Sequence, residues 1–415
     1  MVMRLFVAVG ALVCTVTSTA ATRATDAVSE WNEIALTATT NTNPPQGPVP
    51  QMRTMTIVQV AIHDAVNGIT GEYRTFLSAA DVPRNASPAA AAIAAAHTVL
   101  TQLFPAQRAT FDRARAASMA ANRTSESDPG IKFGQAAASV ILARASGDGF
   151  GQAQIRYVPP NAGTPGAWVL VGNEPAVLPA LGKATPWVLR STSQFRPGPP
   201  PALSSETYVR DYDEVKALGS LAGSKRSPEQ TAIAEFWFAA PSPIWNGVAR
   251  QMLVARHADL STIARVFALM YLAASDASIA CWEAKYNYLF WRPITAIRNA
   301  DRDGVGATTA DAEWQPLTDT HQHPEYPSGH ATNSAAMAGI LIAVFGEKPG
   351  VRLVVKSPTN PGLTRAWSTF KEGLDEVTDA RIYGGFHFRN SDEAGVRLGS
   401  HVAQFVFANA LQPAR

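Results

Sequence analysis

Apolar side chains recur at helical spacing along almost the whole of this chain, and this period limits the fold more than any other feature of the sequence. In residues 54–69, for example, the apolar residues recur three, four and seven positions apart, which places them on one face of a helix. Alternating patterns that would predict strands are scarce. Helices are expected over residues 54–69, 88–121 with a break at Pro105, 130–146, 206–218, 228–239, 248–256, 260–297, 328–345, 364–378 and 392–410. The sequence therefore predicts an all-α protein built as a helical bundle.

One long stretch interrupts the helical pattern. Residues 150–206 are rich in proline, glycine and short polar residues, with a Pro-Gly-Pro-Pro-Pro run at 197–201. Long segments without secondary structure in compact domains are usually functional or disordered. We expect an irregular surface excursion that rims a site. It belongs to an N-terminal helical region over residues 22–258, and residues 259–412 form a helical core that holds the motifs described below.

The first residues differ in composition from the rest of the chain. A short basic start is followed by an apolar run over residues 5–16 and by small residues at 18–21. This order predicts a secretory signal peptide over residues 1–21. The alternative, a membrane anchor, would need about 20 apolar residues. We expect an exported protein, periplasmic or secreted, with no membrane span in the mature chain.

Charge and cysteine content exclude several classes of protein. The formal net charge is +2, so no broad basic surface for nucleic acid is expected. Cys14 lies in the predicted signal peptide, which leaves Cys281 alone and allows no intramolecular disulfide. Beside Trp282 in an apolar helical pattern, Cys281 is expected to be a small buried hydrophobe rather than a nucleophile. The sequence has no Cys/His cluster with zinc spacing.

Two segments in the C-terminal part carry groups that attract an anion. The first holds Lys285 and Arg292, whose separation of seven residues predicts two cations on one helix face. The second is the Pro-Ser-Gly-His sequence that ends at His330. There Ser328 is a good N-cap, the start of the following helix presents free N–H groups, and Gly329 lets a ligand approach the backbone.

A third segment places Arg381, two glycines and His387 in one short stretch. Each segment alone is a weak signal, because an isolated histidine is more often structural and helical cations usually face solvent. Together, two arginines, a lysine, a serine hydroxyl and a helix start supply the donors that a tetrahedral oxyanion requires. Of the two histidines, one can bond the central atom while the other moves protons.

In this order, the motifs Lys-x6-Arg-Pro, Pro-Ser-Gly-His and Arg-x5-His resemble the signature shared by vanadium-dependent haloperoxidases and type-2 phosphatidic acid phosphatases. The resemblance covers residues 285–388. Residues 53–67 are also similar to the N-terminal helical region of bacterial haloperoxidase-like proteins. The length of 415 residues agrees with that branch, since minimal lipid phosphatases are shorter and usually membrane-embedded.

The resemblance implies a role for each motif residue. His387 would be the axial ligand of vanadium, or the nucleophile that forms a phosphohistidine in a phosphatase. His330 would be the acid/base, and Lys285 would also polarise a peroxide oxygen. Vanadate has the charge and shape of phosphate, so either anion would occupy the same site. The residues that would bind its oxygens are Lys285, Arg292, Ser328, Gly329 through its backbone N–H, and Arg381.

Two positions near the motifs bear on the choice of halide. Trp282 stands three residues before Lys285, where haloperoxidases similarly carry a tryptophan close to the pocket. His323 matches a position that is phenylalanine in fungal chloroperoxidases and histidine in algal bromoperoxidases. This match favours bromide or iodide. The alternative is a loop histidine beside His321 that has no role.

The chain departs from the family pattern at two places. Family members commonly have an aspartate four residues after the histidine of the third motif, where this chain has Ser391 followed by Asp392. A metal-bound histidine needs a partner on its other nitrogen, so we expect Asp392, Ser391 or a backbone carbonyl there. Chloroperoxidases also carry an acid in an upstream Phe-Trp segment, which here reads Phe-Trp-Phe-Ala-Ala at 236–240. Both departures argue against strong chloride oxidation.

Three functions are compatible with the sequence. The preferred one is an exported vanadium-dependent haloperoxidase that oxidises bromide or iodide with hydrogen peroxide at a vanadate held by the Lys/Arg/Ser/His residues. The second is an acid phosphatase that hydrolyses a phosphate ester through a phosphohistidine. The third is a phosphate- or vanadate-binding protein, which the two histidines disfavour because anion capture needs neither. The organic substrate and the oligomeric state stay open.

Overall fold

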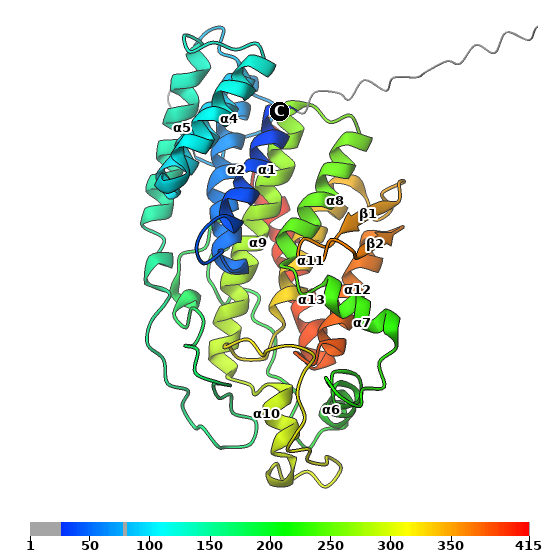
Figure 1. The fold of residues 1–415 in the computed structure, drawn as a ribbon. Coiled ribbons are helices and arrows are strands. Elements are labelled where there is room, and N and C mark those ends of the chain that lie inside the picture. The colour runs from blue at the N-terminus through cyan, green and yellow to red at the C-terminus, as the bar shows by residue number, and fades with distance from the viewer. Residues whose placement is uncertain (1–25, 78–80, 415) are drawn as a thin grey trace, which may run out of the picture.

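The computed structural model describes residues 26–77 and 81–414, so the predicted signal peptide lies outside the described residues. These residues form thirteen α-helices and one two-stranded antiparallel sheet, which confirms the predicted all-α bundle (Figure 1). The helices are α1 Ala27–Thr40, α2 Pro48–Thr70, α3 Pro88–Leu103, α4 Arg108–Ala121, α5 Pro129–Ser146, α6 Glu206–Leu218, α7 Pro228–Phe236, α8 Pro241–Ala255, α9 Leu260–Tyr288, α10 Pro293–Arg298, α11 Gly329–Phe345, α12 Phe370–Tyr383 and α13 Arg389–Asn409, and the strands are β1 Leu353–Lys356 and β2 Thr364–Trp367.

Many helices begin at a polar cap that is followed by proline. Ser87 accepts a hydrogen bond from the Ala90 N–H at the start of α3, and Ser227 forms a reciprocal capping box with Gln230 at the start of α7. The cap satisfies a backbone donor that has no partner inside the helix. Proline fits the first helical position because its missing N–H would be unpaired there anyway. Helices α2 and α8 also start at a proline, several residues before the predicted starts at 54 and 248.

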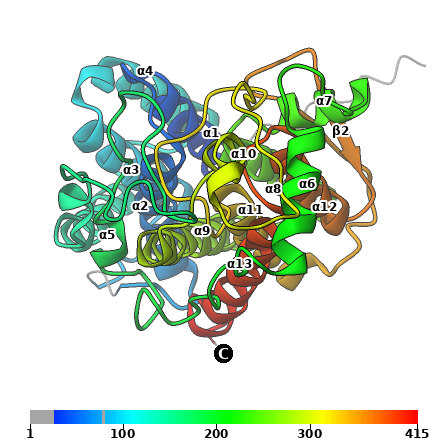
Figure 2. The same ribbon diagram turned by 90° about the horizontal axis from the view of Figure 1, so that it is seen from below.

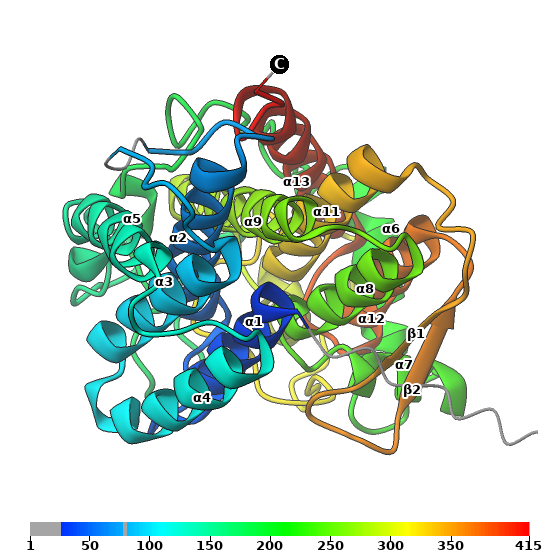
Figure 3. The same cartoon turned by 90° about the horizontal axis from the view of Figure 1, so that it is seen from above.

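The long helix α9 runs through the centre of the molecule. Helices α1 to α5 lie on one side of it, and α8, α11, α12 and α13 lie on the other (Figures 1 and 3). By length and composition α9 could cross a membrane, and the bent pair α3–α4 passes the same test if it is counted as one span. The apolar window of α9 is completely buried inside the protein, as in the core helix of a globular domain.

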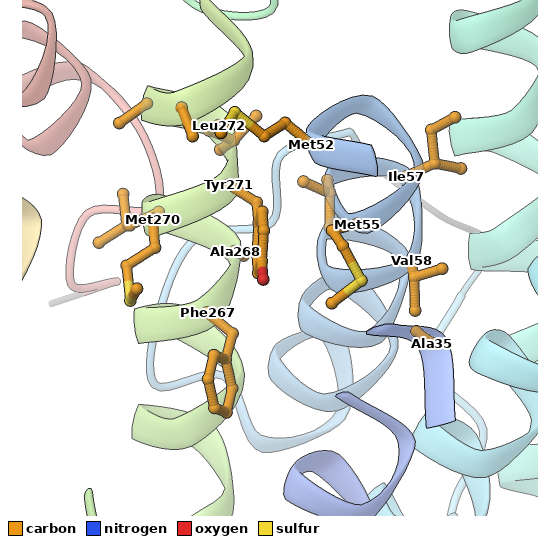
Figure 4. Close-up of a cluster of buried hydrophobic side chains, with 14 of the residues drawn as sticks. Ala35, Met52, Met55, Ile57, Val58, Phe267, Ala268, Met270, Tyr271 and Leu272 are labelled. Carbon is orange, nitrogen blue, oxygen red and sulfur yellow. The ribbon is translucent and has the colours of Figure 1, made fainter. Parts of the chain in front are cut away.

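The contact between α2 and α9 joins the two sides of the bundle. Met52 and Met55 of α2 face Phe267 and Tyr271 of α9 across a packed apolar layer (Figure 4), and all four side chains are buried. Burial of one side chain of this size stabilises the fold by about 1.5–3 kcal/mol. The hydroxyl of Thr56 donates to the Tyr271 carbonyl at 2.8 Å, so the layer also contains a satisfied polar contact.

One helix was missed and one predicted helix is wrong over part of its length. No helix was expected over α1, although Asp26 caps it and Ala27, Val28 and Trp31 bury its inner face. The predicted helix over 364–378 is a strand, β2, followed by helix α12. The β2 residues pair with Leu-Val-Val-Lys of β1, whose β-branched pair favours a strand. The helix then starts after the Thr369 cap.

The irregular excursion over residues 150–206 is fixed to the bundle by a buried carboxylate. Asp276, in the middle of α9, accepts hydrogen bonds from the backbone N–H groups of Trp187, Val188 and Leu189 at 2.6, 2.7 and 2.8 Å. Figure 2 shows this excursion, α6, α10 and the loop before α11 gathered at one end of the bundle. The candidate site lies at this end.

Candidate active site

The three sequence motifs come together at the ends of four helices. Lys285 lies in the last turn of α9, and Arg292 lies in the loop before α10. Ser328 caps α11, and Arg381 lies in the last turn of α12. The loop from α12 to α13 supplies His387. We call the full set the cage; its members are Lys285, Arg292, Ser328, Gly329, His330, Arg381 and His387.

Lys285 and Arg292 do not share a helix face, so that prediction is wrong. Helix α9 ends at Tyr288, and Leu289 adopts a left-handed conformation with φ of 51°. Arg292 precedes Pro293 and is extended, with ψ of 155°, because proline disfavours the helical conformation of the residue before it. Both cations still reach the cage, and neither side chain is exposed.

Backbone carbonyls hold the two cations in place. The Lys285 ammonium donates to the carbonyls of Pro324 and Glu325 at 2.8 and 2.9 Å. The Arg292 guanidinium donates to the carbonyls of His323 and Phe386 at 2.9 and 3.0 Å. Burial lowers the pKa of Arg292 to about 10, against the raising effect of nearby Glu325, so its charge persists at neutral pH.

The cage also holds buried polar atoms that have no hydrogen-bond partner among the described residues. They are Nε and Nη2 of Arg381 and Nε2 of His330, together with both carboxylate oxygens of nearby Asp392. Only Nη1 of Arg381 is bonded, to the Trp237 carbonyl at 3.3 Å. A buried donor without an acceptor costs about 1–3 kcal/mol. The two unpaired N–H groups of Arg381 indicate a site that an anionic ligand completes.

The second nitrogen of His387 is bonded by a residue that sequence reasoning missed. Nδ1 of His387 lies 2.9 Å from Oε1 of Glu325. The same carboxylate accepts from the Phe388 N–H at 3.0 Å and from the Ser391 hydroxyl at 2.5 Å. The expected partners Asp392, Ser391 and a backbone carbonyl were therefore wrong. The Asp392 oxygens are unpaired, and Ser391 acts only through Glu325.

This arrangement sets the tautomer of His387. The Glu325 carboxylate accepts the Nδ1 proton, so the lone pair of His387 lies on Nε2, which faces Nη1 of Arg292 at 3.4 Å. Burial, followed by the charge of Arg292, holds the pKa of His387 well below its ordinary value. The ring is neutral, and its Nε2 lone pair, which only the long contact from Arg292 meets, can bond an electrophilic atom.

The other ionisable groups of the cage are shifted by burial as well. Burial, followed by the charge of Arg381, holds the pKa of His330 well below its ordinary value. Burial lowers the pKa of Lys285 and raises that of Glu325, and the opposite charge of each partner opposes both shifts. Burial also raises the pKa of Asp392, against the nearby Ser328 hydroxyl and Arg381 cation.

His323 lies in contact with the cage. Its Nδ1 is 2.9 Å from Nη2 of Arg292, and its ring packs against Trp282 with centroids 4.9 Å apart. The ring of His321 stacks on the other side, 5.9 Å away. Gly329 gives Trp282 its room, since a Cβ there would lie 3.4 Å from the indole. Cys281 is buried, as expected.

A cavity of about 390 Å³ opens over the cage, and Gly329, His330 and His387 form part of its wall. The excursion contributes Gln154 and residues 177–178 to the same wall, as the sequence suggested. The N-terminal part of α2 also contributes, through residues 48–50. Sequence reasoning assigned no chemistry to α2, which lines the cavity here without contributing to the cage.

The donor set fits a tetrahedral oxyanion better than a bare metal cation. Among the described residues, no cluster of three or more His, Cys, Asp or Glu side chains is placed to hold a metal ion. The cage instead offers buried cations beside the start of α11, and two nitrogen atoms of one of them, Arg381, lack hydrogen-bond partners. Vanadate and phosphate both satisfy these donors, and the His387 nitrogen is suited to bond the central atom.

Comparison with known proteins agrees with this arrangement. Residues 265–415 match the family model of the VCPO second helical-bundle domain. Vanadium chloroperoxidase of Curvularia inaequalis is 29% identical over 205 residues, which cover 41% of this chain and 33% of that protein. The match thus spans about one third of the length of this relative.

Solved structures show the same fold along nearly the whole chain. The first bacterial vanadium-dependent iodoperoxidase has a TM-score of 0.77 and 24% identity, and the superposition covers 93% of this chain and 95% of that one. An apo-type bacterial vanadium-dependent chloroperoxidase has a TM-score of 0.68 and 19% identity, and covers 87% of this chain and 94% of that one. At these identities the likeness establishes the fold.

Proposed function

We propose that the chain is a vanadium-dependent haloperoxidase that oxidises bromide or iodide with hydrogen peroxide, in keeping with its match to the VCPO second helical-bundle domain and its similarity to vanadium haloperoxidases. The observation that carries the proposal is the pairing of Arg381, whose buried Nε and Nη2 lack acceptors, with a neutral His387 whose Nε2 lone pair is met only by a long contact from Arg292. A phosphate-like metal oxyanion matches both features at once.

Each cage residue has a task in this proposal. His387 would bond vanadium through Nε2, with its ring oriented by Glu325. Lys285, Arg292, Arg381, Ser328 and the Gly329 N–H would bind the vanadate oxygens. Bound vanadate would supply the Lewis acid that activates hydrogen peroxide toward halide. His330 is neutral at Nε2 and would accept a proton from the incoming peroxide.

The surroundings of His330 and His323 support bromide or iodide over chloride. The 236–240 segment presents backbone to the cage instead of an acid: the Trp237 carbonyl accepts from Arg381, and the Ala239 backbone bonds His330. No carboxylate in that segment raises the basicity of His330. His323 contacts both Arg292 and Trp282, so it is placed to affect a halide that approaches the cage.

Export is part of the proposal. It rests on the basic, apolar and small-residue order of residues 1–21, which lie outside the described structure. N-terminal sequencing of the protein recovered from the periplasm or the medium should start at Ala21 or Thr22. A start at Met1 would contradict cleavage.

The experiment that tests the enzymatic proposal is a pair of assays on one purified batch. The first measures bromide and iodide oxidation with hydrogen peroxide and vanadate, and the second measures aryl-phosphate hydrolysis without vanadate. Halide oxidation that is suppressed by added phosphate would support a haloperoxidase with one shared anion site. Hydrolysis that is suppressed by vanadate, without halide oxidation, would make the chain an acid phosphatase. Anion binding with neither activity would leave a binding protein.

A further inference from the structure

A second cavity lies beside the cavity over the cage. Its volume is about 800 Å³, and it lies between α10, the loop before α11 and the excursion, at the end of the bundle shown in Figure 2. We call it the polar groove; its wall consists of residues 171–174, 221, 294, 298 and 315–322. His321 and Gln322 also line the cavity over the cage. In the described part of the chain no other residue belongs to both walls, so this pair forms the partition between them.

The two cavities differ in what they offer to a proton. The outer wall over the cage includes residues 48–50 of α2 and Pro241 of α8, whose side chains neither donate nor accept protons. The polar groove instead presents the carboxylates of Glu174 and Asp319, which are both exposed. Its cation, Arg298, donates through Nε to a backbone carbonyl and forms no ion pair among the described residues. Protons from solvent therefore find acceptors on the groove side of the partition.

Of the two partition residues, His321 is the one with a free side chain. Oε1 of Gln322 accepts from the Val171 N–H at 2.9 Å, and the amide nitrogen of Gln322 donates to the Val171 carbonyl, so both ends are occupied. The ring nitrogens of His321 make no hydrogen bond to any described residue, and the residue is exposed. Thr320, next to it, lines the groove with a buried hydroxyl that has no partner among the described residues either. An unpaired hydroxyl and an unpaired imidazole thus occupy consecutive positions at the partition.

The ring of His321 is held in place by its neighbours. The rings of His323 and Phe386 lie nearly parallel to it, with centroids 5.9 and 5.8 Å away. Desolvation by this packing, followed by the charge of Arg381, lowers the pKa of His321 to about 3. The ring is therefore neutral, with one N–H and one lone pair. Such a ring can accept a proton at one nitrogen and release the proton of the other.

The proposed reaction consumes a proton in every turnover. Bromide attacks one oxygen of hydrogen peroxide, the Br–O bond forms as the O–O bond breaks, and the released hydroxide takes up the proton to become water. Bromide is oxidised by two electrons and peroxide is reduced by two. His330 would handle this proton at the cage, and the proton must be resupplied from solvent. His321 and His330 line the same cavity, and a charge on His321 would lower the pKa of His330, so the two rings lie close enough to interact.

We propose that His321 is a proton relay that connects the polar groove with His330. A proton from the groove binds one ring nitrogen of His321, and the proton on the other nitrogen leaves into the cavity over the cage. Water carries it from there to His330; one molecule occupies about 30 Å³ in the liquid, so a cavity of about 390 Å³ has room for several. The inference rests on the proposed haloperoxidase function for the demand for protons and on the two cavities alone for the route.

The route is tested first without vanadate or peroxide, on protein that carries ¹⁵N-labelled histidine. NMR measures how fast the ring N–H of His330 exchanges its proton with water. In His321→Phe, which keeps a flat ring against Phe386 but has no ring nitrogen, we expect this exchange to slow at least about tenfold. Added imidazole should restore it, because the small base can occupy the place of the lost ring. His321→Gln, which cannot take up a proton, should show the same loss and replaces His321→Phe if that variant does not fold.

His401→Phe is the matched control, since His401 is an exposed histidine of α13 that lines neither cavity. Exchange at His330 should stay at the wild-type rate in this variant. Wild-type exchange in both His321 variants would overturn the proposal, because protons would then reach His330 by another route. A loss that imidazole does not restore would also overturn it, because the ring of His321 would then only support the structure.

Turnover of the vanadate-loaded protein gives the second test. At low buffer concentration we expect kcat for bromide oxidation to fall about tenfold in His321→Phe, a smaller loss than the ~10²–10⁴ expected at His330 because some protons still enter from the apolar side. Vanadate affinity and the KM for bromide should stay at the wild-type values, and imidazole should restore kcat. An unchanged kcat in His321→Phe would overturn the relay. If the wild type oxidises no halide, the haloperoxidase function fails, and the exchange of the His330 proton alone decides the route.

Discussion

Two buried clusters of this molecule contain the same kinds of side chain but differ in how those side chains are bonded. In α2, both nitrogens of His63 have partners, the Arg74 carbonyl and the Asn67 amide, each at 3.1 Å. Both oxygens of Asp64 accept backbone N–H groups, at 2.7 and 2.9 Å. In the cage region, Nε2 of His330 and both oxygens of Asp392 have no partner among the described residues.

Burial and shifted pKa values do not separate the two clusters. Burial lowers the pKa of His63 to about 4 and raises that of Asp64 to about 7. Burial likewise lowers the pKa of His330 and raises that of Asp392. What differs is the bonding of the pair itself: every polar side-chain atom of His63 and Asp64 has a partner, whereas Nε2 of His330 has none among the described residues. The N-terminal pair is therefore structural, and the cage is left open to a ligand.

The largest expected effect is at the nitrogen that would bond the metal. In His387→Ala, halide oxidation should be abolished at any vanadate concentration, because no other side chain offers a neutral nitrogen held by Glu325. The protein should still fold, at a lower thermal unfolding temperature, because the variant loses the Nδ1 hydrogen bond to buried Glu325 and the long contact of Nε2 with Arg292. Rate assays with increasing vanadate, together with circular dichroism, check both parts. Turnover at the wild-type rate would refute the assignment.

The next effect is at the proton acceptor. His330→Ala should slow halide oxidation by about 10²–10⁴, the usual contribution of a general acid/base. Vanadate affinity should fall much less than the rate, because the cations of the cage stay in place. Titration with vanadate, monitored by absorbance, separates the two quantities. A loss of affinity as large as the loss of rate would give His330 a binding role instead.

A smaller effect is expected at the group that orients His387. Glu325→Gln keeps the shape but removes one acceptor from a carboxylate that serves three donors. We expect vanadate affinity to fall about 10- to 100-fold, as for other outer partners of a metal-bound histidine. Ser391→Ala is the matched control, since it removes a donor and leaves the carboxylate on His387. Equal losses in the two variants would contradict the orienting role of Glu325.

Most helices and most site residues were predictable because both depend on short-range patterns. The repeats of the helical pattern, the caps followed by proline and the residues within each of the three motifs are all only a few positions apart along the chain. Where the sequence failed, the missing information was tertiary. The partner of His387 was sought within five residues downstream, whereas Glu325 is sixty-two residues upstream and meets it only in the fold.

The failure at Lys285 and Arg292 has a similar cause. A separation of seven residues fits two helical turns. The apolar pattern of the segment does not change at Leu289, the left-handed residue at which α9 ends. Pro293 is the one local signal, because proline disfavours a helical Arg292. The strand β2 was missed because its pairing partner, β1, lies across a loop and decides the conformation.

The two clusters also differ in what an Asp→Asn change should do to stability. In Asp64→Asn the new NH₂ group faces a backbone N–H that loses its acceptor, at a cost of about 1–3 kcal/mol. In Asp392→Asn the amide oxygen can still accept from the nearby Ser328 hydroxyl, so the free energy of unfolding without ligand should stay within about 1 kcal/mol of wild type. Urea unfolding of both variants measures the difference. A larger cost at Asp392 would show that this carboxylate is bonded in the folded protein.

The smallest effect is a pH dependence that belongs to α2. His63 has a folded pKa of about 4, below its ordinary value of 6.5, because burial and then nearby Arg265 disfavour the charged ring. The unfolded chain therefore takes up a proton first as the pH falls, and the stability that neutral His63 provides is lost between pH 6.5 and 4. The difference between the two pKa values corresponds to about 3 kcal/mol.

His63→Gln, which can still donate to the Arg74 carbonyl, should remove this loss. Asp64 acts in the opposite direction, because its folded pKa of about 7 lies above its ordinary value of 3.8 and its contribution to stability grows as the pH falls from 7 to 4. Asp64→Asn should therefore make the free energy of unfolding fall more steeply as the pH is lowered, whereas His63→Gln should remove that fall. Urea unfolding at half-unit steps from pH 7 to 4 compares the three proteins. If the free energy of unfolding varies with pH in the same way in all three proteins, neither His63 nor Asp64 changes protonation on unfolding. Their hydrogen bonds would then offset the effect of burial on their pKa values.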